Sequence, residues 1–359
     1  MKVLVTGSAG FIGFHTARRF LDAGHDVVGF DGFTDYYDPR LKRRRNEILS
    51  SYDLFTSIEG MLEDATLLAE TIKLHHPEIV IHLAAQAGVR YSIESPGTYL
   101  SANIQGTFNL LEALRYNVPR HLLLASTSSV YGGNTTFPFV ETVRTAFPVS
   151  LYAATKCAGE AISHSYAHLF GIPTTCFRFF TVYGPWGRPD MALFKFVDRI
   201  LRDEEIEVYG NGAMSRDFTF IEDLVEGVVR LSAVIPESVD SRDQIADGDS
   251  LSPVAPWRAV NIAGGQPIPL LRFITAIEEA LGKQAKKKML PMQAGDVIDT
   301  MASPELLSVL TGYAPSTPIE QGVKAFVEWY ASHQRDPALV RSPVLPTREL
   351  RGQLSAGRR

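Results

Sequence analysis

The segment KVLVTGSAGFIG, residues 2–13, decides the fold of this chain. Lys2 to Thr6 predict a buried strand, and the residues that follow the turn predict a helix. Between these two elements, Gly7 permits a tight turn, Gly10 lets the backbone approach a phosphate, and Gly13 lets helix and strand pack closely. A glycine-rich turn before the positive end of a helix is typical of dinucleotide-binding βαβ units. The segment therefore predicts a dinucleotide-binding domain.

Asp31 follows the next predicted strand, Asp26 to Phe30, and bears on the choice of cofactor. Its carboxylate can accept hydrogen bonds from both ribose hydroxyls and would repel a 2′-phosphate, so it favours NAD. A basic run that could neutralise such a phosphate follows: Arg40, Lys42, Arg43, Arg44 and Arg45. We interpret this run as a solvent-exposed helix face and expect NAD as the cofactor.

Strands alternate with helices through the first half of the chain. The expected strands are at 79–83, 121–125 and 174–179, and the expected helices are at 11–23, 67–75, 106–116 and 152–170. This alternation indicates an α/β fold with a doubly wound, Rossmann-like parallel sheet. We therefore expect a Rossmann NAD-binding domain over residues 1–180.

The pattern changes after Gly184. Shorter elements are expected there, with helices at 191–201, 222–231, 269–280 and 318–332, strands at 206–209 and 259–262, and a loop over the polar residues 236–256. We expect a smaller, partly discontinuous α/β substrate domain over 181–333, with some segments returning to the first domain. Residues 334–359 carry Arg, Pro and Ser without an apolar period, so we expect a disordered tail.

The composition indicates a cytoplasmic protein that is soluble and globular. Of the 359 residues, 45% are hydrophobic and 21% charged, and the net charge is −5, which gives no electrostatic reason to expect a nucleic-acid partner. No apolar run is long enough to span a membrane, and no signal peptide is visible. The two cysteines, Cys157 and Cys176, lack the spacing of a disulfide framework or a metal site, so we expect no metal.

Tyr152 and Lys156 lie four residues apart, so a helix places both side chains on one face. Thr127 belongs to the segment STSSVYG, residues 126–132, which directly follows an apolar strand whose carboxyl end should face the ligand crevice. Lys156 and a positively charged nicotinamide would favour the tyrosinate and lower a phenol pKa that is ordinarily about 10. A tyrosine tuned in this way can act first as general base and then as general acid. These residues indicate redox chemistry at a carbinol carbon.

With these motifs the chain resembles the extended short-chain dehydrogenase/reductase superfamily. Five further segments are similar to UDP-glucuronate 4-epimerases: DGFTDYYDPRLK (31–42), HLAAQAGVRYS (82–92), FFTVYGPWGRPDMA (179–192), MSRDFTFI (214–221) and PMQAGDV (291–297). The resemblance extends from residue 1 to about 333. It implies tightly bound NAD and interconversion of UDP-glucuronate and UDP-galacturonate through a 4-keto intermediate.

The resemblance also implies roles for individual residues. Tyr152 would be the catalytic base, Lys156 its partner and a ligand of the cofactor ribose, and Thr127 a bridge between substrate and tyrosine. The NAD site would include Gly7, Gly10, Phe11, Ile12, Gly13, Asp31, Ala84, Ala85, Asn103, Lys156 and Phe179. The substrate site would include Ala87, Val89, Arg90, Ser128, Ser129, Thr181, Arg188, Phe194, Tyr209, Arg216 and Asp296.

Within the substrate site, Arg216 would hold the diphosphate and Asp296 the uridine ribose. Phe194 and Tyr209 would lie near the uracil or its ribose, although either aromatic alone also fits a core position. Arg216 beside an aspartate also fits a surface ion pair. Adenine recognition stays open, because Met61 stands where relatives carry an acid.

Three alternatives for the function stay open. The first is another UDP-sugar 4-epimerase. The second is a UDP-glucuronate decarboxylase or a 4,6-dehydratase, but those relatives carry Glu or Asp-Glu where this chain has Ser128 and Ser129. The third is a non-catalytic NAD(H)-binding protein, which the intact catalytic residues disfavour. The resemblance and the apolar helices at 106–116 and 152–170 further indicate a homodimer.

Overall fold

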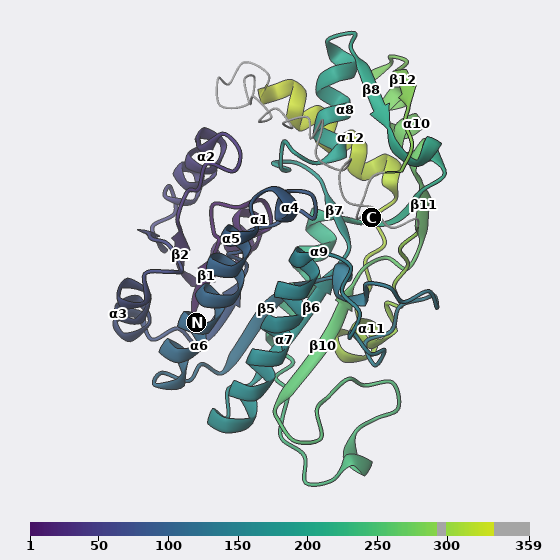
Figure 1. Ribbon diagram of the computed structural model, residues 1–359. Coiled ribbons are helices and arrows are strands. Elements are labelled where there is room, and N and C mark those ends of the chain that lie inside the picture. The colour runs from purple at the N-terminus through teal and green to yellow at the C-terminus, as the bar shows by residue number, and fades with distance from the viewer. Residues whose placement is uncertain (293–298, 334–359) are drawn as a thin grey trace, which may run out of the picture.

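The computed structural model describes residues 1–292 and 299–333. Its largest element is a sheet of seven parallel strands (Figure 1). In spatial order the strands are β10 (Trp257–Ile262), β6 (Thr174–Phe179), β5 (His121–Thr127), β4 (Ile79–His82), β1 (Lys2–Thr6), β2 (Asp26–Asp31) and β3 (Phe55–Glu59). The order reverses between β1 and β4, which confirms the doubly wound α/β fold and puts a ligand crevice at the carboxyl ends there.

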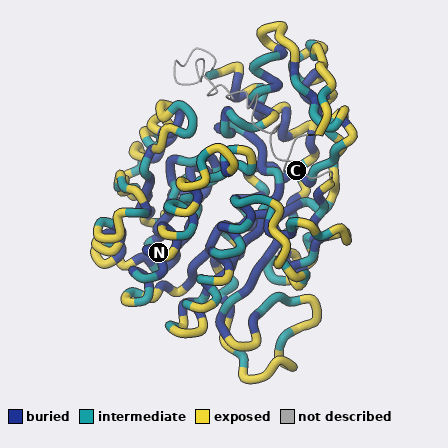
Figure 2. The backbone as a smooth tube through the Cα atoms, in the orientation of Figure 1, coloured by how far each residue is buried: buried dark blue, intermediate teal, exposed yellow. Residues whose placement is uncertain are grey.

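Helices cover both faces of this sheet, and its central strands are buried (Figure 2). One face carries α1 (Phe11–Asp22), α2 (Pro39–Leu49), α9 (Ile221–Ser232) and α11 (Glu305–Thr311). The other face carries α3 (Ala65–His75), α6 (Gly106–Arg115) and α7 (Leu151–Phe170). Because both faces are covered, β4 and β5 are buried along their whole length, and each contains an uninterrupted apolar stretch, residues 79–81 and 122–125.

The second part of the chain forms a smaller region above the carboxyl ends of the large sheet (Figure 1). It contains two small sheets, β11-β9-β7 and β12-β8. Their strands are β7 (Thr181–Tyr183), β8 (Glu205–Val208), β9 (Ser215–Phe220), β11 (Pro267–Pro269) and β12 (Lys286–Met289), and the helices packed with them are α8 (Ala192–Leu201), α10 (Leu270–Leu281) and α12 (Ile319–His333).

Short helical segments complete the described chain. They are α4 (Tyr91–Glu94), α5 (Pro96–Tyr99), the π-helix η1 (Leu100–Gln105), and the 3₁₀ turns η2 (Ser128–Tyr131), η3 (Tyr209–Gly212) and η4 (Arg242–Gln244). No helix in residues 1–292 and 299–333 is both long and apolar enough to cross a membrane. The same residues hold no group of three or more His, Cys, Asp or Glu side chains that could bind a metal ion.

The predicted helices and strands lie within two residues of the observed ones. The sequence analysis did not predict β3, β9, the short strands β7, β11 and β12, or helix α11. β3 is an edge strand with half-buried and exposed residues only, and β9 begins with Ser215-Arg216-Asp217, so neither has a continuous apolar run. β10 comes from the second half of the chain but pairs with β6, so this segment lies in the large sheet.

The interpretation of the basic run as an exposed helix face is wrong for Lys42 and Arg45, both of which are buried. Helix α2 turns these two positions toward the body of the protein, since residues three apart share a helix face. Lys42 donates from Nζ to the carbonyl oxygen of Thr34 at 2.7 Å. The other three basic residues of the run, Arg40, Arg43 and Arg44, are exposed as expected.

Candidate active site

A cavity of about 870 Å³ opens where β1, β2, β4, β5 and β6 end, and residues of the smaller region close its other side. It brings together most of the residues that the sequence singled out. Those that line it are Gly7, Gly10, Phe11, Ile12, Gly13, Asp31, Ala84, Ala85, Ala87, Val89, Thr127, Ser128, Ser129, Tyr152, Lys156, Phe179, Thr181, Arg188 and Arg216.

The glycine turn forms one wall and has no room for side chains. Gly7 has a φ of +74°, and a Cβ atom there would lie 2.8 Å from the backbone nitrogen of Ala84. A Cβ at Gly13 would lie 2.0 Å from the carbonyl oxygen of Gly7. No described side chain caps the N-terminus of α1 at Gly10. The first amides of the helix therefore point at the cavity without a capping group, which fits a pyrophosphate.

Asp31 lies at the end of β2 with its carboxylate fixed by the backbone. Oδ2 accepts a hydrogen bond from the Ala9 amide at 3.0 Å, and Oδ1 accepts one from the Phe33 amide at 2.8 Å. The side chain is buried and lines the cavity, and each oxygen keeps a further lone pair. The carboxylate is thus placed to accept from ribose hydroxyls, as the sequence leads us to expect.

Helix α7 positions Tyr152 and Lys156. Ser150 caps the helix by accepting from the Ala153 amide at 3.1 Å, which places Tyr152 in the first turn. Burial raises the pKa of the Tyr152 phenol, whereas the Thr127 hydroxyl, which donates a hydrogen bond to it, and the charge of Arg188 act in the opposite direction. The protein's own groups therefore do not produce the lowered phenol pKa expected from the sequence.

Lys156 lies one helical turn further along α7 and reaches the end of β5. Its Nζ donates to the carbonyl oxygen of Ala125 at 2.9 Å. Burial lowers the pKa of this ammonium to about 8. The cation is therefore charged at neutral pH and loses its charge in the mildly alkaline range.

Hydroxyl groups surround the end of the cavity near the phenol. Thr127 accepts from the Ser129 amide at 3.2 Å, and the Thr127 and Ser129 hydroxyl oxygens lie 3.3 Å apart, so η2 is held in place. Ser128 and Thr181 line the same cavity. These hydroxyls can donate to an anionic group of a ligand without forming a salt bridge.

Arg188 also lines this end of the cavity, but an acidic neighbour holds it. Its Nε donates to Oδ1 of Asp190 at 2.9 Å, and its Nη2 donates to Oδ2 at 2.5 Å. Tyr36 donates to the same Asp190 carboxylate at 3.1 Å. Arg188 is therefore an ordered part of the cavity wall rather than a solvated loop cation.

Four of the predicted residues do not line the cavity: Asn103, Arg90, Phe194 and Tyr209. Arg90 lies over the ring of Tyr209, with 5.0 Å between guanidinium and ring centre. Phe194 is buried in the core and its ring lies 5.3 Å from that of Tyr330. Asp296 lies outside the described residues.

Asn103 is buried in the π-helix η1 behind the cavity wall. Its side-chain oxygen accepts from the Gln86 amide at 2.8 Å, and its amide nitrogen donates to the Gln86 carbonyl at 3.0 Å. The same nitrogen donates to the hydroxyl of Thr155, also at 3.0 Å. The structure places Asn103 as a support for the loop that carries Ala84 and Ala85.

Several lining residues were not assigned to the site from the sequence, although some lie in the segments that resemble the epimerases. Tyr36, Tyr37 and Lys42 come from the loop before α2 and from α2 itself, and others come from separate segments: Gly132, Gly133, Asn134, Thr135, Phe137, Phe139, Val149, Ser150, Met191, Asp299 and Thr300. These residues come from segments far apart in the sequence, and no spacing between them predicts that they line one cavity.

Glu63 is a further lining residue with a specific feature. Its Oε2 atom is buried, and within the described residues it has no hydrogen-bond partner. The neighbouring Asp64 instead caps α3 by accepting from the Leu67 amide at 3.0 Å. Of the two acids that follow Met61 in the sequence, Glu63 is the one that lines the cavity.

Comparisons with known proteins agree with this site. The sequence pattern of the NAD dependent epimerase/dehydratase family matches residues 3–241. A probable UDP-glucuronate 4-epimerase of Rhizobium meliloti (strain 1021) is 55% identical over 335 residues, which cover 93% of this chain and 98% of that protein. The crystal structure of UDP-glucuronic acid 4-epimerase from Bacillus cereus in complex with UDP-glucuronic acid and NAD has a TM-score of 0.82 at 32% identity, covering 92% of this chain and 99% of that one. The chain belongs to the NAD dependent epimerase/dehydratase family.

Proposed function

We propose that this chain is a UDP-glucuronate 4-epimerase, which interconverts UDP-glucuronate and UDP-galacturonate with tightly bound NAD. One observation carries the proposal: a single cavity joins the glycine turn, the pair Tyr152 and Lys156, and the hydroxyl groups beside Thr127. The relative from Rhizobium meliloti, at 55% identity, supports the choice of substrate. The Bacillus cereus structure, which contains UDP-glucuronic acid and NAD, supports the choice of ligands.

The residues present fit NAD. The uncapped start of α1 suits the pyrophosphate, and the fixed carboxylate of Asp31 suits the ribose hydroxyls. Lys156 would hold the ribose nearer the nicotinamide, and Phe179 would flank the ring. When bound, NAD supplies a hydride acceptor for carbon 4 of the sugar and a hydride donor for its return.

Tyr152 moves the proton that accompanies the hydride. Its phenolate takes the proton of the sugar 4-hydroxyl, and its phenol gives a proton back when the 4-keto group is reduced from the other face. Thr127 donates a hydrogen bond to the phenol oxygen and thereby stabilises the phenolate. Since burial alone raises the phenol pKa, positive charge near it is required, and Lys156, Arg188 and the oxidised cofactor are the sources.

The hydroxyl groups suit a substrate that has to turn. A 4-keto sugar must present both faces to the cofactor, and a bidentate arginine clamp on its carboxylate would favour one orientation. Ser128, Ser129 and Thr181 offer donors that can be exchanged during the turn. Arg188 already forms two bonds with Asp190, so its guanidinium is held away from such a clamp.

Two alternative reactions differ from the proposed one in the groups that they need. Dehydration needs a general acid, and hydroxyl groups occupy positions 128 and 129. Another UDP-sugar 4-epimerase would use the same catalytic groups and differ only in the pocket for carbon 6. The ratio of efficiencies for UDP-glucuronate and UDP-glucose separates these two epimerases.

The active form is proposed to be a homodimer in the cytoplasm. Large apolar side chains are exposed on and beside the two helices that we expect to pair, with Phe108 at 41%, Tyr116 at 73% and Leu169 at 67%. A second copy of the chain would cover them by packing α6 and α7 against their equivalents. Light scattering across a concentration series tests this, and a monomer throughout would contradict it.

Product analysis by NMR tests the proposed reaction. The purified protein should convert UDP-glucuronate into a mixture with UDP-galacturonate. Tyr152→Phe is the matched control, because it removes one oxygen atom and should keep the fold and bound NAD while losing most turnover. An unchanged substrate spectrum with the wild-type protein would contradict the proposal, and a near-normal rate in Tyr152→Phe would contradict the role of Tyr152.

A further inference from the structure

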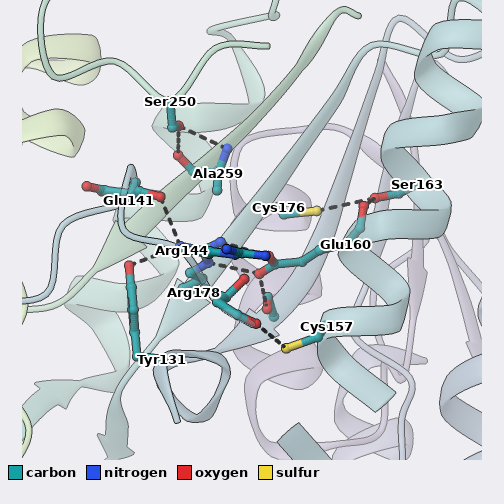
Figure 3. Close-up of polar contacts among 12 residues, drawn as sticks. Tyr131, Glu141, Arg144, Cys157, Glu160, Ser163, Cys176, Arg178, Ser250 and Ala259 are labelled. Atoms are coloured by element: carbon teal, nitrogen blue, oxygen red, sulfur yellow. Dashed lines mark hydrogen bonds and ion pairs between the residues drawn. The ribbon is translucent and has the colours of Figure 1, made fainter. Parts of the chain in front are cut away.

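A buried ion pair joins the catalytic helix to the two central strands beside it. Glu160 of α7 accepts two parallel hydrogen bonds from Arg178 of β6, Nε to Oε1 at 2.9 Å and Nη2 to Oε2 at 2.7 Å (Figure 3). The hydroxyl of Ser126, on β5, donates to the same Oε1 atom. The charged side chains are 4% and 7% exposed. One carboxylate therefore connects α7, β5 and β6 where water is excluded.

The guanidinium of this pair is held on its far side as well. Arg178 donates from Nη1 to the hydroxyl of Tyr131 at 3.1 Å and to the carbonyl oxygen of Glu141 at 3.3 Å (Figure 3). Tyr131 in turn donates to the side-chain oxygen of Asn261 at 2.7 Å. All three guanidinium nitrogen atoms of Arg178 donate hydrogen bonds, so the guanidinium is held in one position and holds the Glu160 carboxylate with it.

The strand partners of Glu160 are direct chain neighbours of residues in the cavity. Ser126 precedes Thr127, and Arg178 precedes Phe179. Successive side chains of a strand point to opposite faces, so Thr127 and Phe179 line the cavity while Ser126 and Arg178 do not. A shift of the Glu160 carboxylate would therefore also shift Thr127 and Phe179, because both strands are hydrogen-bonded to it.

Glu160 also lies one helical turn after Lys156 on α7, and the charge of Arg178 on β6 is paired with its carboxylate. Burial lowers the pKa of the Lys156 ammonium to about 8, and Cys176 and Glu160 oppose that lowering. Cys176, on β6, carries no charge near pH 8, because burial raises the pKa of its thiol to about 12. His82, on β4, is neutral, because burial and then the charge of Lys156 lower its pKa to about 3. The carbonyl oxygen of Ala125 on β5, which accepts the hydrogen bond from Lys156, is uncharged.

We propose that Glu160 is a positioning residue for the reaction, whose carboxylate fixes α7 against β5 and β6 and places a negative charge one helical turn from Lys156. This inference rests on the proposed function, in which Lys156 acts as an ammonium beside the cofactor ribose. The carboxylate itself touches neither substrate nor cofactor, since Glu160 does not line the cavity.

The pH dependence of turnover in Glu160→Gln tests the proposal. The variant keeps the length of the side chain and removes its charge, so Lys156 should lose its proton more readily. In the pH profile of kcat, we expect the alkaline limb, where activity falls, to move to lower pH by about one unit or more. Glu160→Asp keeps the charge with a shorter reach, and it should lower kcat while leaving the limb at the wild-type pH. A limb that stays in place in Glu160→Gln overturns the proposal.

Asp249→Asn is the matched control. Asp249 and Arg258 form a second bidentate ion pair, with both distances at 2.9 Å and side chains 11% and 9% exposed, and neither residue lines the cavity. The control removes a carboxylate of equal burial, so it should lower thermal stability to a similar degree without moving the limb. An equal shift of the limb in the control would mean that the effect is not local to Lys156, and the proposal would fail.

Release of bound NAD from the purified holoenzyme gives a readout that needs no substrate. The release rate should rise with pH near 8 in the wild type, where Lys156 loses its proton, and at lower pH in Glu160→Gln. A wild-type protein that shows this dependence but does not convert UDP-glucuronate overturns the proposed function alone. If circular dichroism finds Glu160→Gln unfolded, the double variant Glu160→Gln/Arg178→Gln replaces it, since it leaves no buried charge unpaired. Loss of folding in both makes the pair purely structural and overturns the proposal.

Discussion

The ammonium of Lys156 donates a hydrogen bond to the carbonyl oxygen of Ala125, with 2.9 Å between Nζ and oxygen. Ala125 lies on β5 two residues before Thr127, and Lys156 lies on α7 four residues after Tyr152. This contact therefore helps to fix the position of α7 along β5, the strand that carries Thr127. An ammonium has three donors, so two remain for ligands in the cavity.

Replacing this ammonium should impair both catalysis and cofactor retention. Lys156→Met keeps the length and apolar character of the side chain, but it removes the charge and the bond to Ala125. We expect kcat to fall by about 100-fold or more and bound NAD to be lost on gel filtration. Steady-state kinetics and the absorbance of bound cofactor measure the two effects. Wild-type values for both would mean that Lys156 has neither role.

Thr181 is predicted to distinguish the carboxylate of glucuronate from the hydroxymethyl group of glucose. Thr181→Val removes one hydroxyl from the cavity wall and preserves the shape of the side chain. A charge-assisted hydrogen bond contributes about 1.5–3 kcal/mol, so kcat/KM for UDP-glucuronate should fall roughly 10- to 100-fold. The value for UDP-glucose should change far less. An unchanged ratio of the two efficiencies would mean that Thr181 does not bind the carboxylate.

Glu63 is predicted to accept a hydrogen bond from the adenine of NAD. Its buried Oε2 atom has no partner within the described residues, so Glu63→Leu should not lower the stability of the protein without cofactor. The same change should weaken NAD binding by about 1–3 kcal/mol, which is roughly 5- to 150-fold in Kd. Calorimetric titration and thermal melting measure the two effects. Glu70→Gln is the control, because Glu70 is exposed on the nearby helix α3 and does not line the cavity. Equal NAD affinity in Glu63→Leu and Glu70→Gln would refute the role.

Arg45 is predicted to connect the glycine turn to the smaller region. It donates to the carbonyl oxygens of Ala9 at 3.0 Å and Trp186 at 2.6 Å and to the hydroxyl of Tyr37 at 2.9 Å. Arg45→Met would leave these buried acceptors unpaired, and we expect the free energy of unfolding to fall by about 2–3 kcal/mol.

Urea unfolding measures this change, and Arg19→Met is its control. Arg19 forms an ion pair with Glu226 at 3.4 Å, and its side chain is 45% exposed, so its loss should change the free energy of unfolding by less than about 1 kcal/mol. Equal small losses in the two variants would mean that the contacts of Arg45 contribute no more than a surface ion pair.

The sequence predicted the large sheet and most of the cavity because their signals are local. A buried parallel strand is a continuous apolar run, a phosphate-binding turn needs glycine, and one helix carries Tyr152 and Lys156. The burial of Arg45 had no such signal, because a basic residue within a basic run looks the same whether its helix face meets solvent or the glycine turn. The acceptors of Arg45 come from distant parts of the chain, and only the tertiary fold brings Trp186 beside it.

The same reasoning explains the aromatic residues assigned to the substrate. Phe194 belongs to a segment that resembles the epimerases, but its ring packs among Phe326, Trp329 and Tyr330. An aromatic residue near a functional motif has the same local signal whether it touches a ligand or supports the helix behind it. Its predicted contact with uracil is tested by binding measurements on Phe194→Leu rather than by its place in the sequence.

Proton NMR of UDP-glucuronate incubated with the protein in deuterium oxide tests the central claim most directly. Removal and return of the same hydride keeps the original hydrogen on carbon 4, because it never passes through solvent. We therefore predict that UDP-galacturonate appears with a full proton signal at carbon 4 and that the mixture reaches the same composition from either sugar. A product with deuterium at carbon 4, a pentose formed by loss of the carboxylate, or no product at all would contradict the account.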